Sequence, residues 1–589
     1  MDNREVAKIL RETAQLLEID GAIIGRYRSY EKAAELIGGM HERIEEIARD
    51  EEKLTELPGI GESMAGHIRE ILGTGDYALR QKLLKKYPPA ILELLELQSL
   101  GPKKVAFLWK KFKVATVDAL AQLARDEKLR DLPGFGEKSE QNILKAAEQH
   151  KNLAGSRRVH LHVAEEEAEK LARYIAQSCE AVESVTPAGS LRRGRETIGD
   201  LDLLVTMKAR RDSQKEIDAV AEHILKYPPI RQTLAHGENK VSILLDNGLQ
   251  ADVRLLRKEC FGAALLYFTG SKEHNVILRG RANAMGWTLN EYALTTLKGG
   301  RTIAGKTEEE IYAKLKLAYI EPELREARGE IEAAERAPLP RLIALGDIRG
   351  DLQMHTTASD GKNSIEEMAE AARQLGREYI AITDHSKAVT VANGMDEKRT
   401  LEQLKKIRAA QQRVPGIRLF AGIEVDIRKN GSLDLDNEVL AQLDVVVASV
   451  HSYMNLGRAE MTERLLAAIE NPYTQIVAHP TGRLVLRREP FDYDMEKVLE
   501  AARKNGVAME CNAYPERLDL NDVHLRTAKK HGVKIVISTD AHATRHLAFM
   551  KYGVITARRG WIEKADVLNA LPAGEFLAAL RPKAKGARQ

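Results

Sequence analysis

The stretch that decides the fold of the central region is GSLRRGRETIGDLDLLV, residues 189–205. Its last residues alternate polar and apolar side chains, and residues two apart on a strand share a face. The alternation predicts a strand that presents Asp200 and Asp202 side by side while Leu201 and Leu203 face the core. Paired carboxylates repel each other unless a cation lies between them, and hard oxygen ligands suit Mg²⁺ or Mn²⁺. We therefore predict a metal site on this strand.

A third carboxylate follows on a neighbouring strand. The runs VSILL and LQADVRLL are joined around Asn247-Gly248, a pair typical of a type I′ hairpin, which predicts an antiparallel or mixed sheet. Asp252 in the second run can meet the first two carboxylates across adjacent strands. Three carboxylates can hold two metal ions, one activating a primer 3′-hydroxyl and one neutralising the leaving pyrophosphate. The candidate catalytic residues and metal ligands are Asp200, Asp202 and Asp252.

The residues that precede this strand suit a triphosphate. Gly189, Ser190 and Arg193 would supply backbone amides, a hydroxyl and a guanidinium group. An isolated Asp-x-Asp pair is common on a solvated strand edge. The Gly-Ser-x-Arg-Arg-Gly motif and the third carboxylate favour nucleotidyl transfer over that interpretation.

Three glycine-rich turns occur in the helical pattern of the first 155 residues: LPGIG at 57–61, LPGFG at 132–136 and the looser SLGPK at 99–103. Such turns leave backbone N–H groups at the start of the next helix, where they can hold a phosphate without reading sequence. A single copy could be a plain turn between two helices, but three copies favour helix-hairpin-helix elements. The predicted DNA contacts are Gly59, Gly61, Gly101, Gly134 and Gly136.

From residue 347 onward, short apolar strands alternate with amphipathic helices, which predicts a parallel βα barrel with its chemistry at the carboxyl ends of the strands. One histidine at a strand end is usually structural, but five of them in one repeat are hard to explain in that way. Imidazoles mixed with carboxylates suit two or three Zn²⁺, Mn²⁺ or Fe²⁺ ions. The predicted ligands are His355, Asp360, His385, Glu424, His451, His479, Asp540 and His542.

The overall composition narrows the class of protein. The net charge of +3 neither requires nor excludes a polyanionic partner. The three cysteines, Cys179, Cys260 and Cys511, form no C-x-x-C pair, which argues against a disulfide framework and fits a reducing cytosol. No run of about 18 apolar residues occurs, so a protein that is neither exported nor membrane-bound is expected.

Residues 1–320 closely resemble the family X DNA polymerases. The resemblance includes the motif just described and the segment Tyr267-Phe268-Thr269-Gly270-Ser271, followed by His274-Asn275 and Arg279. It implies that Tyr267 and Phe268 flank the incoming sugar, although both could equally be core aromatics. It further implies that Asn275 touches the minor groove of the nascent base pair and that Arg279 contacts the template strand. The remaining contacts expected from it are Gly199 and Gly270 for the nucleotide and Arg254 for DNA.

The N-terminal stretches YRSYEKAAELI (27–37) and LPGIGESMAGHI (57–68) resemble the small domain of that family, which binds the 5′-phosphate at a gap. In some members a lysine of this domain removes a deoxyribose phosphate through a Schiff base. His67 stands where the resemblance would place that lysine, and Ser63 replaces another usual lysine. A Schiff base needs a primary amine, so a DNA-gripping role without lyase chemistry is expected, with Arg26 near the phosphate.

Residues 345–575 resemble the polymerase and histidinol phosphatase (PHP) domain, a seven-stranded βα barrel with up to three metal ions. In that resemblance Glu424 bridges two metals, and His385 and His542 share a third. Clustered ions would generate a hydroxide and hold the attacked phosphate. The family usually opens with H-x-H, whereas Gln353 precedes Met354-His355 here, and an amide is a poor substitute for an imidazole.

These observations predict a multidomain α/β protein. It would combine a helix-hairpin-helix region, a nucleotidyltransferase palm with a mixed sheet, and a distorted seven-stranded βα barrel. The expected domains are a small helical domain (1–87), a fingers-like helical domain (88–155), the palm (156–256), a thumb-like domain (257–320), a linker (321–346), the PHP domain (347–575) and a basic tail (576–589).

The expected function is gap filling in base excision repair or end joining, with 3′–5′ exonuclease or abasic-site endonuclease activity from the PHP domain. The expected partners are gapped or primed double-stranded DNA and deoxynucleoside triphosphates, with no membrane, for a monomer in the bacterial cytoplasm or nucleoid. One alternative is a DNA-binding phosphoesterase with a vestigial polymerase half, against which three adjacent carboxylates argue. The other is a non-catalytic organiser of DNA ends, which would incorporate no nucleotide.

Overall fold

A computed structural model describes residues 3–39, 44–57, 59–97, 100–132, 135–136, 140–141, 143–144, 158–178, 180–208, 214–237, 239–336 and 338–583. The chain divides into two compact units, Met1–Arg157 and Arg158–Gln589. Among the described residues no helix combines the length and the apolar character that a membrane crossing requires.

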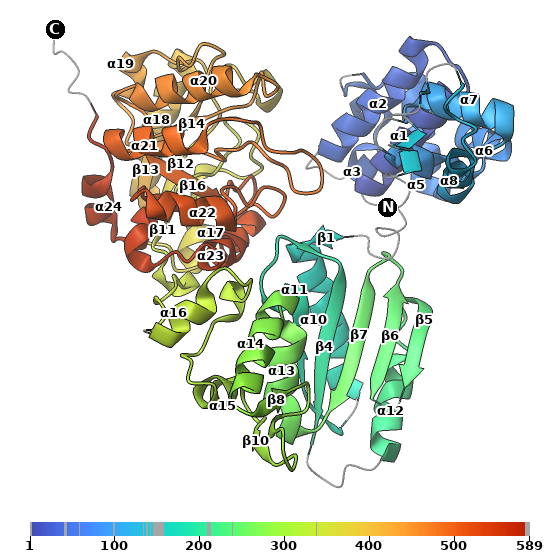
Figure 1. The fold of residues 1–589 in the computed structure, drawn as a ribbon. Coiled ribbons are helices and arrows are strands. Elements are labelled where there is room, and N and C mark those ends of the chain that lie inside the picture. Colours follow the sequence, from blue (N-terminus) through green and yellow to red (C-terminus); the bar gives the residue numbers. More distant parts are fainter. Residues whose placement is uncertain are drawn as a thin grey trace. The chain divides into compact units, whose positions relative to one another are not determined.

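The first unit is helical, as the sequence predicted. Its core consists of buried aliphatic side chains such as Leu10, Ile68 and Leu94. Gly61 and Gly101 are the N-caps of α5 and α7, so two of the predicted glycine-rich turns each lead directly into a helix. The predicted contact Gly134 lies outside the described residues. The elements are α1 Asn3–Ile19, α2 Ile24–Gly39, α3 Ile44–Ile47, α4 Glu51–Thr55, α5 Glu62–Thr74, α6 Ala78–Lys86, η1 Pro89–Glu96, α7 Pro102–Phe112 and α8 Val117–Arg125 (Figure 1).

The second unit begins with a five-stranded mixed sheet in the order β2-β4-β7-β6-β5, on which helices α10 and α12 pack. Strands β4 and β7 run parallel, while the other neighbours are antiparallel, so the predicted mixed sheet is confirmed. Gly248 has φ +82° in the β6–β7 turn, where the Asn-Gly pair predicted a hairpin. The elements are β1 Val159–His160, α10 Leu161–Ser178, β2 Val182–Pro187, α11 Gly189–Arg192, β3 Thr197–Ile198, β4 Asp200–Met207, α12 Gln214–Ile224, β5 Ile230–Gly237, β6 Lys240–Leu245 and β7 Gln250–Leu256.

A smaller helical and β subdomain follows, and it includes the segment expected to be a linker. Instead of a free linker, the described residues of this segment contribute Leu324, Ile331 and Leu342 to the core of the subdomain. The charged composition predicted an exposed linker, but the charged side chain of Arg325 is fully buried and pairs with Glu308. The elements are η2 Lys258–Cys260, α13 Phe261–Thr269, α14 Lys272–Ala284, β8 Trp287–Leu289, β9 Leu294–Thr296, β10 Thr302–Ala304, α15 Glu308–Lys314, η3 Pro322–Leu324 and α16 Glu330–Arg336.

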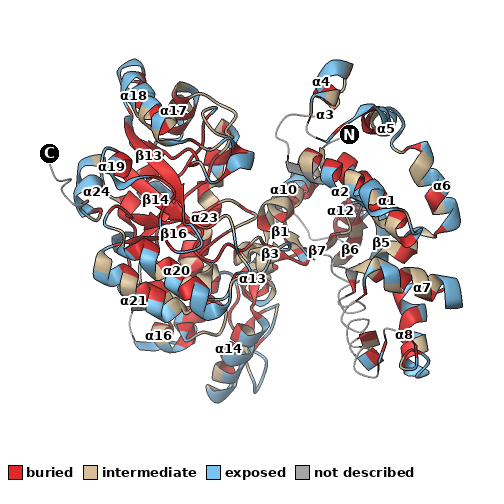
Figure 2. Ribbon diagram, turned by 90° about the horizontal axis from the view of Figure 1, so that it is seen from above, coloured by how far each residue is buried: buried red, intermediate tan, exposed pale blue. Residues whose placement is uncertain are grey.

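The C-terminal part is the predicted barrel. Its seven parallel strands pair in sequence order, and a bridge between Met354 and Ala541 brings the first and last strands together, so that the barrel is nearly closed. Figure 2 shows the buried strands inside a layer of partly exposed helices. The strands are β11 Gly350–Asp351, β12 Tyr379–Ile382, β13 Arg418–Asp426, β14 Val445–Ser449, β15 Ile476–Val477, β16 Ala508–Asn512 and β17 Ile535–Ser538. The helices are η4 Leu345–Asp347, α17 Ile365–Gln374, η5 Thr390–Ala392, α18 Glu397–Arg413, α19 Asn437–Leu440, α20 Arg458–Glu470, α21 Met495–Asn505, α22 Asp522–Lys530, η6 Thr544–Phe549, α23 Met550–Arg559, η7 Lys564–Asp566, η8 Leu568–Ala570 and α24 Ala573–Ala579.

Residues 576–583, the described part of the predicted basic tail (576–589), are docked on the barrel. Arg581 donates hydrogen bonds to the carbonyls of Ile469, Asn471 and Thr474. Lys583 donates to the carbonyls of Leu440 and Leu443. These two cations therefore satisfy carbonyl groups of the barrel.

The buried Glu308–Arg325 pair generates a stability prediction. Glu308 also accepts hydrogen bonds from Arg192, at 2.9 and 2.7 Å. Burial alone would raise the pKa of Glu308, yet the two arginines lower it to about 2. Replacing Glu308 with Gln leaves the buried guanidinium of Arg325 and the partly buried one of Arg192 without this counterion, so we expect a loss of about 3 kcal/mol in the free energy of urea unfolding at pH 7.

The matched control is Glu335→Gln, because Glu335 pairs with Arg281 at 3.1 Å but is 54% exposed, and it should cost less than about 1 kcal/mol. Because the folded-state pKa of Glu308 is depressed, the ionised carboxylate stabilises the folded protein above about pH 4.5, and this stabilisation is lost as the pH falls toward 2. Equal losses of unfolding free energy in Glu308→Gln and Glu335→Gln would contradict the claim that the buried Glu308–Arg325 pair stabilises the fold.

Candidate active sites

Three carboxylates meet on adjacent parallel strands. Asp202 on β4 lies directly opposite Asp252 on β7, and Asp200 is two residues earlier on the same face. Burial raises the pKa of Asp202 to about 7, and the negative charges of Asp200 and Asp252 add to the effect. Burial would also raise the pKa of Asp252, but hydrogen bonds from Lys240, at 2.7 Å, and from Gln250, at 3.1 Å, lower it. Three carboxylates in this arrangement have the chemistry to hold a divalent cation.

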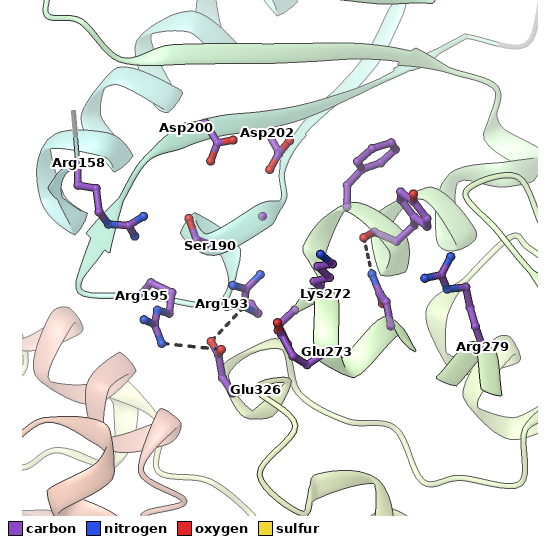
Figure 3. A pocket seen from close by; sticks show the side chains of 16 residues that line it. Arg158, Ser190, Arg193, Arg195, Asp200, Asp202, Lys272, Glu273, Arg279 and Glu326 are labelled. Atoms are coloured by element: carbon purple, nitrogen blue, oxygen red, sulfur yellow. Dashed lines mark hydrogen bonds and ion pairs between the residues drawn. The ribbon is translucent and has the colours of Figure 1, made fainter. Parts of the chain in front are cut away.

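A cavity of about 550 Å³ opens in front of Asp200 and Asp202 (Figure 3). The predicted nucleotide and DNA contacts that line it are Gly189, Ser190, Arg193, Tyr267, Phe268, Gly270, Asn275 and Arg279. Gly199, Asp252 and Arg254 are outside its lining. The structure thus gathers residues that lie about ninety positions apart in the sequence around one opening.

The cavity is rich in positive charge. Arg193 and Arg279 were candidates from the sequence, whereas Arg158, Arg195 and Lys272 were not. The basic run around residue 193 could have identified Arg195, but no local signal marks the other two. A cationic cavity beside three carboxylates can bind a triphosphate together with divalent ions.

Glycine is required at the start of α11. Gly189 has φ +59°, and a Cβ atom at this position would overlap Oδ2 of Asp202. The backbone of the Gly-Ser-x-Arg-Arg-Gly loop can therefore approach the carboxylates closely.

The aromatic pair at the end of α13 belongs to the cavity wall. Tyr267 is 38% exposed, which excludes the alternative of a core aromatic for this residue. The Asn275 side chain donates to the Tyr267 carbonyl at 2.7 Å. The guanidinium carbon of Arg254 lies 4.2 Å from the centre of the Phe268 ring. These contacts fix the orientation of the wall.

A second cluster lies at the carboxyl ends of the barrel strands. Each of three groups offers ligand atoms within 4.8 Å of one another. The groups are His355, Asp360, His385 and His542; His385, Glu424 and His451; and His355, Glu424 and Asp540. His479 is in none of them, but its Nε2 atom is 2.9 Å from a Glu424 carboxylate oxygen. All eight predicted ligands thus lie in one cluster, with Glu424 at its centre.

The donor atoms of this cluster fit metal ions. His355 Nδ1, His385 Nδ1, Glu424 Oε2 and His479 Nδ1 are buried and make no hydrogen bond within the described parts of the chain. Buried polar atoms are normally paired, and a cation would satisfy such atoms. Burial would raise the pKa of Glu424, but the imidazoles of His385, His451 and His479 hold it well below its usual value. Glu424 is therefore ionised and able to bridge two ions.

Two further residues support or adjoin this cluster: Asp426, which no sequence motif marks, and Gln353. Asp426 accepts hydrogen bonds from the backbone N–H and from Nδ1 of His451, both at 3.1 Å, and so orients that ring. Gln353, which stands in place of the usual histidine, is fully buried, and neither of its amide atoms has a hydrogen-bond partner among the described residues.

Comparisons with known proteins match the parts of the chain that contain the two candidate sites. Family models match for a helix-hairpin-helix domain (residues 1–77), a SAM-like helix-hairpin-helix tandem (91–149), the DNA polymerase beta palm (162–243), the DNA polymerase beta thumb (264–326) and the PHP domain (351–514). The DNA polymerase/3′-5′ exonuclease PolX of Bacillus subtilis is 38% identical over 574 residues, covering 97% of this chain and 98% of that protein. A probable phosphatase of Acetivibrio thermocellus is 33% identical over 201 residues, covering 33% of this chain and 78% of that protein. The solved Leishmania infantum polymerase beta, in a ternary complex, is 22% identical with a TM-score of 0.29, covering 40% of this chain and 98% of that one.

The raised pKa of Asp202 predicts that Mg²⁺ binding displaces a proton. Below pH 7 the carboxyl group is mostly protonated and must ionise before it can bind a cation, so Mg²⁺ affinity rises with pH. Titration calorimetry in buffers of different ionisation enthalpy should show close to one proton released per ion at pH 6 and almost none at pH 8.5. The variant Asp202→Asn should lack this release. A release that does not change between the two pH values would contradict the assignment.

Proposed function

Because this chain belongs to the family X DNA polymerases that carry a PHP domain, we propose that it fills short gaps in DNA and hydrolyses phosphodiesters at 3′ ends. Its membership also implies the use of divalent metal ions. The observation that carries the proposal is the convergence of three carboxylates with a cationic cavity. The Gly-Ser-x-Arg-Arg-Gly loop that precedes β4 would add backbone groups that bind phosphate.

In the polymerase half, Asp200, Asp202 and Asp252 would hold Mg²⁺ or Mn²⁺. When bound, these ions activate the primer 3′-hydroxyl and neutralise the leaving pyrophosphate. Lys240 offsets the charge of Asp252 and holds its carboxylate in place through a 2.7 Å contact. The protein thus keeps one carboxylate ionised and aligned beside a neighbour whose charge is suppressed by burial.

The incoming nucleotide would lie along the cavity wall. Ser190 and the guanidinium of Arg193 would bind the triphosphate, with the close backbone approach that Gly189 allows. Tyr267 and Phe268 would flank the sugar. Asn275, already held by the Tyr267 carbonyl, would face the nascent base pair, and Arg279 the template strand.

In the PHP domain, the eight clustered ligands would hold two or three Zn²⁺, Mn²⁺ or Fe²⁺ ions, which when bound supply a hydroxide nucleophile. Glu424 stays ionised among the imidazoles, and Asp426 fixes the tautomer and orientation of His451. We propose 3′–5′ exonuclease activity for this site, the activity in the name of the Bacillus subtilis relative, with cleavage at abasic sites as the alternative.

DNA would be gripped through the glycine-rich turns of the first unit. Gly61 and Gly101 cap the helices that follow them, so backbone N–H groups at these helix starts are placed to meet phosphates. Gly59, Gly134 and Gly136 would complete the contacts. His67 stands where the family resemblance would place the lyase lysine, and its ring shares a 3.1 Å hydrogen bond with Tyr30. Because an imidazole cannot form a Schiff base, this domain would bind DNA without lyase chemistry. Gapped or primed duplex DNA is the proposed substrate, and a cytoplasmic monomer remains a prediction.

Two single substitutions separate the sites. In primer extension on a one-nucleotide-gapped duplex with Mg²⁺ or Mn²⁺, Asp252→Ala should reduce filling by roughly a hundred-fold or more, because one metal position loses a ligand. It should leave strand degradation unchanged. His451→Ala should remove degradation and leave filling unchanged.

The two variants serve as each other's controls for folding. If the intact protein adds no nucleotide with either metal while degradation persists, the polymerase assignment is wrong and the chain is a DNA-binding phosphoesterase. Loss of both activities in either variant would contradict two separate active sites.

A further inference from the structure

The Gly-Ser-x-Arg-Arg-Gly loop, residues 189–194, which we call the nucleotide-binding loop, packs against a helix of the barrel fold. Helix α23 packs on β16 and β17, and its Val554 and Ala557 belong to the barrel core. On its other side, Ile555 contacts Gly194, the last residue of the Gly-Ser-x-Arg-Arg-Gly loop. Gly194 has φ +64°, and a Cβ atom there would overlap Cγ2 of Ile555. The loop and the helix therefore fit together only because this residue is glycine.

The last residue of α23 joins this loop to the barrel through hydrogen bonds. The side chain of Arg559 is only 4% exposed. Its Nη1 group donates to the carbonyl of Arg193 at 2.7 Å and to Glu326 at 3.0 Å. Its Nη2 group donates to Asp522 on α22 at 2.7 Å. One buried guanidinium thus holds both the main chain of Arg193 and a carboxylate beside it.

Glu326 is the same carboxylate that restrains the Arg193 side chain, at 3.1 Å, and it faces Arg195 at 3.8 Å (Figure 3). Asp522, in turn, also pairs with Arg328 at 3.0 Å. Four guanidinium groups therefore share two carboxylates. Arg559 is the one that links them, because it pairs with both Glu326 and Asp522. Burial would raise the pKa of Glu326, but the charges of Arg559, Arg193 and Arg195 keep it lowered, so Glu326 is ionised.

This arrangement determines how freely Arg193 can meet a phosphate. With Arg559 present, part of the charge of Glu326 is already satisfied, and the Arg193 main chain is fixed. Without Arg559, Glu326 would bind Arg193 and Arg195 more strongly, and the loop would lose its anchor. A triphosphate would then have to compete with Glu326 for the same guanidinium.

We propose that Arg559, although part of the barrel fold, is a positioning residue for the polymerase site that sets its affinity for the incoming nucleotide. The proposal rests on the proposed function of the cavity. Arg559 does not line the cavity, so it acts through Arg193 and Glu326 and not on the reacting atoms. Its loss should therefore weaken nucleotide binding and leave the chemical step nearly unchanged.

The test compares Arg559→Met with Arg558→Met in the full-length protein. Arg558 is the adjacent residue of the same helix and makes similar contacts across the same interface, to Glu323 at 2.6 Å and Glu321 at 3.6 Å, but none to Arg193 or Glu326. On a one-nucleotide-gapped duplex, Arg559→Met should raise the KM for the nucleotide about tenfold with kcat within about twofold. Arg558→Met should resemble the wild type, and both variants should keep 3′-end degradation.

A double-variant cycle tests the route through Glu326. In a Glu326→Gln background the competing charge is absent, so Arg559→Met should raise KM by less than it does in the wild-type background. If Arg559→Met does not fold, as judged by thermal unfolding, Arg559→Lys keeps the charge but lacks the planar guanidinium whose two nitrogens reach the Arg193 carbonyl and Asp522 together, and it should shift KM in the same direction. An unchanged KM in a folded Arg559 variant, or an equal change in Arg558→Met, overturns the inference alone. Absence of any incorporation by the wild type would instead overturn the proposed function.

Discussion

The parallel pairing of β4 with β7 is the constraint on which the polymerase half depends. It places Asp202 directly beside Asp252, with Asp200 on the same face, and so concentrates negative charge on one face of the sheet near the start of both strands. Burial and mutual repulsion make this cluster costly without cations, as the raised pKa of Asp202 records. The basic residues of the cavity and the Lys240 contact compensate this charge, and the tight loop at Gly189 lies close against Asp202. A site built in this way is suited to metal ions that arrive with a triphosphate.

The barrel solves the same electrostatic problem with different ligands. Glu424 is ionised because imidazoles surround it, and the parallel strands bring those imidazoles together at their carboxyl ends. The two sites belong to one compact unit, and α23 packs on barrel strands and ends at Arg559 beside the nucleotide-binding loop. The two sites are therefore separate in their ligands, while a buried guanidinium of the barrel fold holds the main chain of Arg193 in that loop.

Much of this was predictable from the sequence because the signals are periodic or local. Strand alternation identified Asp200 and Asp202, and the repeated βα rhythm placed the histidines at one end of a barrel. Residues such as Glu326 and Arg559 could not be found in that way, because their partners are more than a hundred positions away and no pattern marks the contact. The charged composition of residues 321–346 predicted a linker, but Arg325 in this segment is buried against Glu308. In the basic C-terminal segment, Arg581 and Lys583 are docked on carbonyl groups of the barrel.

The most direct test of the carboxylate cluster as the centre of the polymerase site is anomalous scattering from Mn²⁺ in crystals of the full-length protein with gapped DNA and a non-hydrolysable nucleotide. The account predicts manganese peaks between Asp200, Asp202 and Asp252, with the triphosphate against Arg193, and a separate set around Glu424. A bound nucleotide without manganese at the three carboxylates, or one that avoids Arg193, would contradict it.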